Sequence, residues 1–297
     1  MSKNKKLTPA TKIMLAVIVI IAVIVYIFFD MSDDILPGSG SLSDAEVSVH
    51  MIDVGQGDAA FIDNGDHDIL IDAGPGDHAD ELLEYLDAMG VYEIEYAFFS
   101  HPHEDHIGGA DDVINRYKVE NVVMPDYYEN TACYRKLMEA VDYEGSDLVY
   151  TCSGDKFVIG DVTVEIFSPG PRYKPEDANG ISLVMKVSYG DIDTLFTGDA
   201  EVKNEEFVLR NYPDMLDCEI LKVGHHGSST SSSEEFIYAV SPEVALISVG
   251  EGNSYGHPHI ETLAVLNSYL DEIHRTDREG DIVIGMTKDK YWVIEQK

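Results

Sequence analysis

Short apolar segments rich in β-branched residues alternate along residues 47–297 with segments whose apolar residues recur three and four positions apart. The first pattern predicts strands and the second predicts amphipathic helices. The predicted strands are 46–54, 59–64, 67–73, 94–100, 120–125, 156–168, 182–190, 193–198, 218–224, 244–250 and 281–295. The predicted helices are 78–90, 131–145, 202–213, 233–242 and 259–272, and a further helix begins within 108–118.

This order of elements predicts an α/β fold. Helices that alternate with strands indicate sheets covered by helices, whereas adjacent strands with hairpin signals, such as residues 189–193, argue against a purely parallel sheet. An αββα sandwich, with two mixed sheets packed face to face and helices outside, fits both observations. Because no proline-rich break divides residues 47–297, we expect a single domain there.

The N-terminal residues follow a different pattern. Residues 13–29 carry no charge, four lysines precede them and aspartates follow them. At about 1.5 Å per residue, an apolar helix of this length nearly spans a ~30 Å bilayer core. We expect a basic cytoplasmic tail at 1–12, a transmembrane signal-anchor helix at 13–29, a linker at 30–46 and an extracellular domain at 47–297. The alternatives are a buried core helix or a cleaved signal peptide, although no small-residue cleavage site follows Phe29.

Acidic residues dominate the composition. The formal charge is −35, and it is −38 without residues 1–30, which hold four lysines and one aspartate. Such a surface disfavours nonspecific nucleic-acid binding and attracts divalent cations. Any nucleic-acid function must therefore rely on metal ions or on a local patch. The three cysteines are widely spaced. They could form one disulfide outside the cell, but their spacing does not require one.

Four potential metal ligands, His101, His103, Asp105 and His106, occur within the motif at residues 98–112. They fall between a predicted strand and a predicted helix, at the edge of a sheet. His101 and His103 are two positions apart, so they share a face and can hold one metal. Asp105 and His106 follow the turn and can reach a second metal. These ligands suit Zn²⁺, with Mn²⁺ or Fe²⁺ possible; the alternative is a solvated polar loop.

Two later strands also end in potential ligands. Asp199 follows the strand at 193–198, where one carboxylate can bridge two metals or can simply stabilise a turn. His225 and His226 follow the strand at 218–224. Neighbouring residues of an extended strand point to opposite sides. We therefore expect one histidine to bind metal and the other to face substrate or to support the site.

The motifs at 51–62, 69–74, 100–109, 195–201, 221–233 and 253–259 occur in an order that resembles the metallo-β-lactamase superfamily. More narrowly, they resemble the β-lactamase-like domain of ComEC-type competence proteins. The resemblance covers about residues 47–290 and implies the metallo-β-lactamase fold. It does not extend to the multi-helix DNA channel of those proteins, so a separate channel protein is a possible partner.

The resemblance implies a ligand set for two divalent metal ions, with zinc favoured and manganese possible. His101 and His103 would hold the first metal. Asp105, His106 and His226 would hold the second, with Asp199 bridging and His225 contacting metal or substrate. The third histidine that many relatives supply to the first metal is missing, and Asn179 or Ser182 stands nearby instead. This first metal should therefore bind more weakly.

Three further residues are assigned by the same resemblance. Asp72 would brace the histidine loop. Asp58 and His257 would border the cleft, unless they are merely a turn aspartate and a loop histidine.

A metal pair of this kind would activate a bridging water for hydrolysis without a nucleophilic serine. The serine-rich run at 228–233 would then offer hydroxyl and N–H groups to an anionic substrate, or would be a flexible loop. We expect a membrane-anchored, exported dinuclear metallohydrolase acting on phosphodiesters, with DNA suggested by the resemblance to DNA-uptake proteins. The alternatives are a hydrolase of a cell-wall phosphoester, lactam or lactone, a non-catalytic binding or sensor module, and redox chemistry on the same fold.

Overall fold

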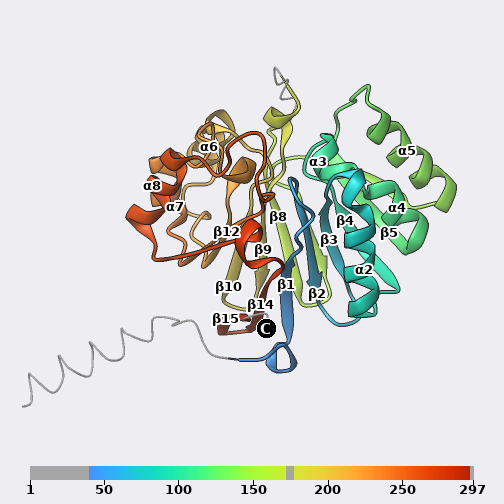
Figure 1. Ribbon diagram of the computed structural model, residues 1–297, viewed down its shortest axis with the longest axis horizontal. Coiled ribbons are helices and arrows are strands. Elements are labelled where there is room, and N and C mark those ends of the chain that lie inside the picture. The colour runs from blue at the N-terminus through green and yellow to red at the C-terminus, as the bar shows by residue number, and fades with distance from the viewer. Residues whose placement is uncertain (1–39, 172–176, 295–297) are drawn as a thin grey trace, which may run out of the picture.

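The computed structural model describes residues 40–171 and 177–294. Two mixed β-sheets pack face to face between two layers of helices (Figure 1). The sequence prediction of an αββα sandwich is therefore confirmed. The predicted membrane helix at 13–29 lies outside the described residues. Within the described ranges, no helix combines the length and the apolar character needed to cross a bilayer.

The first sheet has eight strands in the order β15-β14-β1-β2-β3-β4-β5-β6. They are β1 (Val47–Met51), β2 (Ala59–Asp63), β3 (Ile69–Ala73), β4 (Glu93–Phe98), β5 (Lys118–Pro125), β6 (Asp147–Thr151), β14 (Ile282–Thr287) and β15 (Lys290–Ile294). The strands from β3 to β6 are parallel, whereas β1 pairs antiparallel with β2 and β14. The helices packed outside this sheet are α2 (Ala79–Met89), α3 (Glu104–Ile107), α4 (Ala110–Arg116) and α5 (Ala132–Glu144). The short 3₁₀ turn η1 (Leu42–Asp44) precedes β1, and the 3₁₀ turn η2 (Gly76–His78) precedes α2.

The second sheet has seven strands in the order β13-β12-β11-β10-β9-β8-β7. They are β7 (Lys156–Ile159), β8 (Val162–Ser168), β9 (Val184–Tyr189), β10 (Ile192–Phe196), β11 (Ile220–Lys222), β12 (Val244–Ile247) and β13 (Glu272–Arg275). Helices α6 (Val202–Asn211), α7 (Glu234–Val240) and α8 (Ile260–Tyr269) cover it on the side opposite α2, α4 and α5 (Figure 1). The remaining elements are α9 (Thr276–Glu279) and the 3₁₀ turns η3 (Asn179–Ile181) and η4 (Gly224–Gly227).

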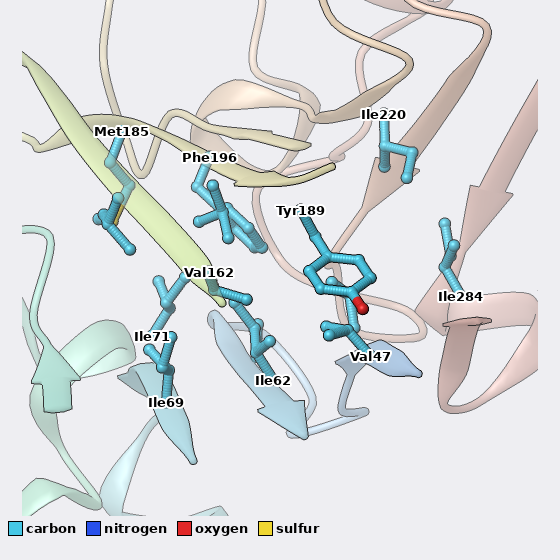
Figure 2. Packing of buried hydrophobic residues seen from close by; sticks show 14 of the residues in the cluster. Val47, Ile62, Ile69, Ile71, Val162, Met185, Tyr189, Phe196, Ile220 and Ile284 are labelled. Carbon is cyan, nitrogen blue, oxygen red and sulfur yellow. The ribbon is translucent and has the colours of Figure 1, made fainter. Parts of the chain in front are cut away.

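The main core lies between the two sheets. Val47, Ile62 and Ile69 of the first sheet face Met185 and Phe196 of the second (Figure 2). Two further apolar clusters fill the space between each sheet and its helices. Each strand that is covered on both faces is buried along nearly its whole length, as in the continuous burial of β1 and β12. The strand ends are thereby held in fixed positions.

Local signals determine where the longer helices begin and end. Thr131 caps α5 by accepting a hydrogen bond from the backbone N–H of Tyr134. Gly90 and Gly145 end α2 and α5 in the left-handed conformation, with φ of 79° at each. Two strands were not predicted from the sequence. The edge strand β6 has no clear alternation, and β13 lies within the end of the predicted helix at 259–272, which stops at Tyr269. Both are edge strands, β6 beside β5 and β13 beside β12, and this pairing is not visible in their own residue patterns.

A buried ion pair links the two halves of the sandwich. Lys222, the last residue of β11 in the second sheet, is 1% exposed, and its Nζ lies 2.6 Å from Oδ2 of Asp58 in the loop between β1 and β2 of the first sheet. Lys222 Nζ also donates to the carbonyl of Val223 at 2.9 Å. Burial opposes ionisation of Asp58, but Lys222, together with His226 and His106, outweighs it and holds the pKa of Asp58 well below its usual range. Asp58 is therefore ionised inside the protein, with Lys222 as its closest partner.

We expect Lys222→Met to lower the free energy of unfolding by about 3–5 kcal/mol, because it removes the closest cation from the buried Asp58 carboxylate. The double variant Asp58→Asn/Lys222→Met should lose less, since neither charge then remains. The measurement is urea unfolding in the presence of a chelator, so that metal binding does not contribute.

Lys156→Met is the matched control. Lys156 pairs with Glu165 at 3.1 Å on the surface, where its side chain is 52% exposed, so its loss should cost about 0–1 kcal/mol. If Lys222→Met destabilised the protein no more than this control, the buried pair would have no special role.

Candidate metal centre

The predicted ligands meet at one end of the sandwich, where strands of both sheets end. His101 and His103 follow β4, Asp199 follows β10, and His226 lies in η4 after β11. His103, Asp199 and His226 lie in the wall of a cavity of about 340 Å³. The cavity is lined by Gln56, His103, Glu104, Asp105, Asn179, Asp199, His225, His226, Tyr255 and His257. Because these strands belong to different sheets, the packing of one sheet on the other sets the distance between the two halves of the site.

The ligand atoms form two groups that share Asp199. One group contains His101, His103 and Asp199, and the other contains Asp105, His106, His226 and Asp199; within each group the potential ligand atoms lie within 4.8 Å of one another. Asp199 Oδ2 lies 3.7 Å from His101 Nε2, and Asp199 Oδ1 lies 3.1 Å from His106 Nε2. His226 Nε2 lies 3.4 Å from Asp105 Oδ2. Each group could therefore hold a metal ion, and Asp199 belongs to both groups.

The three buried histidines each direct an unpartnered nitrogen into the site. The Nε2 atoms of His101, His106 and His226 are buried and have no hydrogen-bond partner among the described residues, and the same holds for Asp199 Oδ1. Buried polar atoms without partners are rare because each one costs desolvation energy. Imidazole and carboxylate atoms that converge in this way have the chemistry of a divalent metal site. The residues present therefore fit a pair of metal ions.

Hydrogen bonds at the opposite ring nitrogens set the orientation of these histidines. His226 Nδ1 lies 3.0 Å from the carbonyl of Ser248, so this nitrogen must be the donor. His106 Nδ1 donates to Asp72 Oδ2 at 2.8 Å. The Ser100 hydroxyl donates to Asp72 Oδ2, which leaves its oxygen to accept from His101 Nδ1 at 3.1 Å. In its neutral form, each ring thus carries its proton on Nδ1 and can offer the Nε2 lone pair to a metal.

Asp72 holds the histidine loop in place. Besides His106, its carboxylate accepts hydrogen bonds from the backbone N–H and the hydroxyl of Ser100, both at 2.7 Å. Its backbone has a φ of 58°, which is unusual for a residue with a side chain. This strain occurs near the end of β3, where the surrounding hydrogen bonds fix the conformation. Asp72 thus contacts both Ser100 and His106 of the histidine loop.

The charges of the site are strongly interdependent. Burial opposes ionisation of Asp199, but His106 and His226 outweigh it and hold the pKa of Asp199 well below its usual range. Burial also lowers the pKa of His226, yet Asp199 and Asp58 prevail and raise this pKa to about 10. Burial and the neighbouring His106 lower the pKa of His101 well below its usual value. Without a metal, the carboxylates of the site are thus compensated by protonated imidazole at His226.

His225 and His226 do not follow the predicted geometry. We expected neighbouring residues of an extended strand, but β11 ends at Lys222 and both histidines have left-handed backbones, with φ of 50° and 52°. His226 is buried within the second group. His225 lies at the rim, with Nε2 at 3.6 Å from Asp199 Oδ2 and Nδ1 at 3.1 Å from the hydroxyl of Thr230. One ring is buried and the other lies at the rim, and the left-handed turn, rather than the alternation of side chains along a strand, directs them apart.

The residues considered in place of the missing third histidine occupy different positions. Asn179 lines the cavity, and its Oδ1 is buried without a hydrogen-bond partner among the described residues. Ser182 lies beneath, where its hydroxyl accepts a hydrogen bond from the backbone N–H of Asp199 at 3.2 Å. Asn179 is therefore available to the site, whereas Ser182 supports Asp199. His257 lies in the cavity wall.

Asp58 lies under the cavity rather than along its lining. Its Oδ1 is 3.2 Å from His226 Nδ1, and its backbone N–H donates to the carbonyl of Asp105 at 3.0 Å. At the preceding position, a Cβ on Gly57 would lie 2.4 Å from the same carbonyl, so only glycine fits there. The sequence did not lead us to Lys222, the ion-pair partner of Asp58. The sign of this pair was a lysine inside a predicted apolar strand, because lysine is rarely buried unless it is paired.

Several polar groups of the serine-rich run at 228–233 hold the loop in place. The backbone N–H groups of Ser232 and Ser233 donate to Glu205, and the hydroxyl of Ser231 donates to the carbonyl of Gly224. The N–H of Ser229 donates to His259 Nδ1. These groups are therefore already used within the protein, and a contact between this run and an anionic substrate stays a prediction for its exposed residues Ser229 and Thr230. The three cysteines are free, and Cys133 and Cys218 are buried.

Comparisons with known proteins agree with this geometry. Residues 52–251 match the metallo-beta-lactamase superfamily. The chain is 32% identical over 257 residues to ComE operon protein 3 of Bacillus subtilis, covering 80% of this chain and 33% of that protein. It is 34% identical over 257 residues to Recombination protein 2 of Haemophilus influenzae, covering 84% of this chain and 30% of that protein.

A solved structure shares the fold at low sequence identity. CmlA, a diiron beta-hydroxylase from Streptomyces venezuelae, superposes with a TM-score of 0.55 at 13% identity, over 82% of this chain and 54% of that chain. The present chain spans about a third of the length of the two relatives named above. With the family match, the shared fold and the two ligand groups in view, the chain belongs to the metallo-beta-lactamase superfamily and is related to bacterial competence proteins.

Proposed function

We propose that the protein is a dinuclear metal-dependent hydrolase that cleaves phosphodiesters, with DNA as the substrate suggested by its relationship to competence proteins. The observation that carries this proposal is Asp199, whose two carboxylate oxygens face two separate groups of histidine nitrogens. A single metal would leave one of these groups without a function. The proposed metals are zinc or manganese, both of which accept imidazole and carboxylate ligands.

Each proposed ligand has a defined place. His101 and His103 would hold the first ion, Asp105, His106 and His226 would hold the second, and Asp199 would contact both. A bound pair of divalent ions supplies a water of lowered pKa and neutralises charge that develops on the reacting group. The protein contributes orientation, because Asp72 and the Ser248 carbonyl fix the ring protons of His106 and His226. His225 lies at the rim, where it can contact substrate.

The positive charge of the proposed metal ions would favour an anionic reacting group. The described residues that line the cavity include Glu104, Asp105 and Asp199 but no lysine or arginine. Two divalent ions would add four positive charges at the centre of this acidic surface, so the attraction for a phosphodiester would be confined to the reacting position. This resolves the conflict between a formal charge of −35 and a nucleic-acid substrate.

The first prediction from this proposal concerns activity. Protein loaded with Zn²⁺ or Mn²⁺ should hydrolyse single-stranded DNA and bis-p-nitrophenyl phosphate, whereas nitrocefin should remain intact. Asp199→Asn should reduce turnover by about a thousandfold or more, because it removes the ligand shared by both groups. The measurement is initial rates at matched metal content.

His67→Asn is the control for this experiment. His67 pairs with Glu95 on the surface, so its replacement should leave turnover unchanged. Cleavage of nitrocefin without cleavage of phosphodiesters would instead favour a lactam substrate. If metal bound in the expected amount but no substrate reacted, a binding or sensor module would become the better interpretation.

A second prediction concerns protons. Because carboxylates raise the pKa of His226 to about 10, and Asp199 and Asp72 likewise outweigh burial to raise the pKa of His106, both rings are protonated at pH 7.5 in the metal-free protein. Metal binding should release about two protons from them, so the affinity should fall steeply as the pH is lowered. Calorimetric titrations in buffers with different ionisation enthalpies measure this number. Release of no protons would contradict the assignment of these rings as ligands.

We also propose that residues 13–29 anchor the protein in the membrane with residues 47–297 outside the cell. The proposal rests on the uncharged segment and on the lysines that precede it. An alkaline phosphatase fused after Lys297 should be active in intact cells, and a fluorescent protein that matures only in the cytoplasm should remain dark. Deletion of residues 1–30 should reverse both results, whereas the opposite pattern in the full chain would overturn the proposed topology.

A further inference from the structure

Tyr255 stands at the mouth of the metal cavity with 66% of its surface exposed. It lines the 340 Å³ cavity and also a neighbouring hollow of about 350 Å³. The two hollows share Gln56, Glu104, Asp105 and Tyr255, so they adjoin at this residue. A group that extends from the reacting centre into the second hollow therefore passes between these four residues, with Tyr255 as the aromatic one.

The ring of Tyr255 is the outermost of three nearly parallel rings. It stacks on His257 with centroids 5.6 Å apart and an interplanar angle of 22°. His257 in turn faces His226 at 6.3 Å and 27°. A flat aromatic support therefore connects the proposed metal ligand to the exposed tyrosine.

Hydrogen bonds fix the turn that carries Tyr255. Asn253 Oδ1 accepts from the backbone N–H groups of Tyr255 and His257, and its Nδ2 donates to the carbonyls of Gly250 and His257. His259 accepts from the N–H of Ser229 at Nδ1, which leaves Nε2 to donate to the carbonyl of Tyr255 at 3.3 Å. The ring is thus positioned before any ligand arrives, and little conformational entropy is lost on binding.

The charges around Tyr255 exclude the usual way of holding a nucleic-acid backbone. Besides Glu104 and Asp105, the second hollow is lined by Asp77, and neither hollow has a lysine or arginine among its described lining residues. Lys222 lies beneath the site and is paired with Asp58. Flanking phosphates therefore gain no cationic contact here, and affinity must come from uncharged groups. Stacking of aromatic side chains on bases is such a contact, and it requires bases that are unpaired.

We propose that Tyr255, supported by His257, stacks on a base of a single-stranded nucleic acid while the adjacent phosphodiester occupies the metal cavity. This inference rests on the phosphodiesterase function proposed above and specifies how that site selects its substrate. Duplexes are disfavoured because their bases are already stacked. One stacked base contributes about 1–3 kcal/mol, which corresponds to a factor of about 5 to 150 in affinity.

The test compares two oligomers of equal length and charge, (dT)₈ and an octamer of abasic sites, with the metal-loaded full chain. The wild-type protein should have a KM for (dT)₈ about 5 to 150 times lower than for the abasic octamer. Tyr255→Ala should lose most of this preference, and Tyr255→Phe and Tyr255→Trp should retain it. Tyr143→Ala, at a tyrosine that is 83% exposed on α5, is the control and should keep the wild-type preference.

Fluorescence separates this inference from the proposed activity. The native sequence has one tryptophan, Trp292, which is buried in β15. In Tyr255→Trp, mixing with (dT)₈ in a stopped-flow instrument should quench the new tryptophan, and the abasic octamer should not. If neither oligomer were cleaved but (dT)₈ still quenched the fluorescence, the hydrolase proposal would fail and the stacking site would stand. Cleavage without base preference or quenching would overturn the stacking site alone.

Discussion

The carboxylate of Asp199 imposes the main constraint on this structure. It is 2% exposed, it stands between two groups of histidines, and one of its oxygens has no hydrogen-bond partner among the described residues. A buried carboxylate in this position is stable only where positive charge surrounds it. In the metal-free protein that charge comes from protonated imidazoles, as the raised pKa values of His106 and His226 indicate. Metal ions would replace those protons at the same atoms.

Much of the surrounding structure keeps these charged groups away from water and at fixed distances from one another. Asp72, His225 and His226 all have left-handed backbones, which residues with side chains adopt at an energetic cost. Hydrogen bonds from Ser100 and to Ser248 hold the strained segments. The Lys222–Asp58 pair joins the two sheets directly below His226. Because the two halves of the site come from different sheets, such cross-links determine the spacing of the ligand groups.

The acidic surface is compatible with the proposed phosphodiester substrate if the substrate is attracted only at the metal cavity and at Tyr255. Long-range repulsion acts against any polyanion, so a strand would approach this protein slowly. At the site, by contrast, the reacting phosphate would meet the proposed ions and a base would meet Tyr255. Selection would thus depend on short-range contacts that need an unpaired strand. The same repulsion keeps duplex nucleic acid from binding nonspecifically elsewhere on the surface.

The sequence by itself determined the fold class and the segments that carry the ligands. Apolar segments of strand length alternating with amphipathic helices predicted the sandwich, because the spacing of apolar residues along the chain, which fixes the period of each element, depends on residue order alone. The histidines and Asp199 could be named because each follows a predicted strand. Only the tertiary structure decided how they meet. It brought Lys222 to Asp58, turned His225 and His226 into left-handed conformations, and used the Ser231 hydroxyl and the backbone N–H groups of Ser232 and Ser233 within the protein. These outcomes depend on contacts between segments far apart in the chain, which no local pattern records.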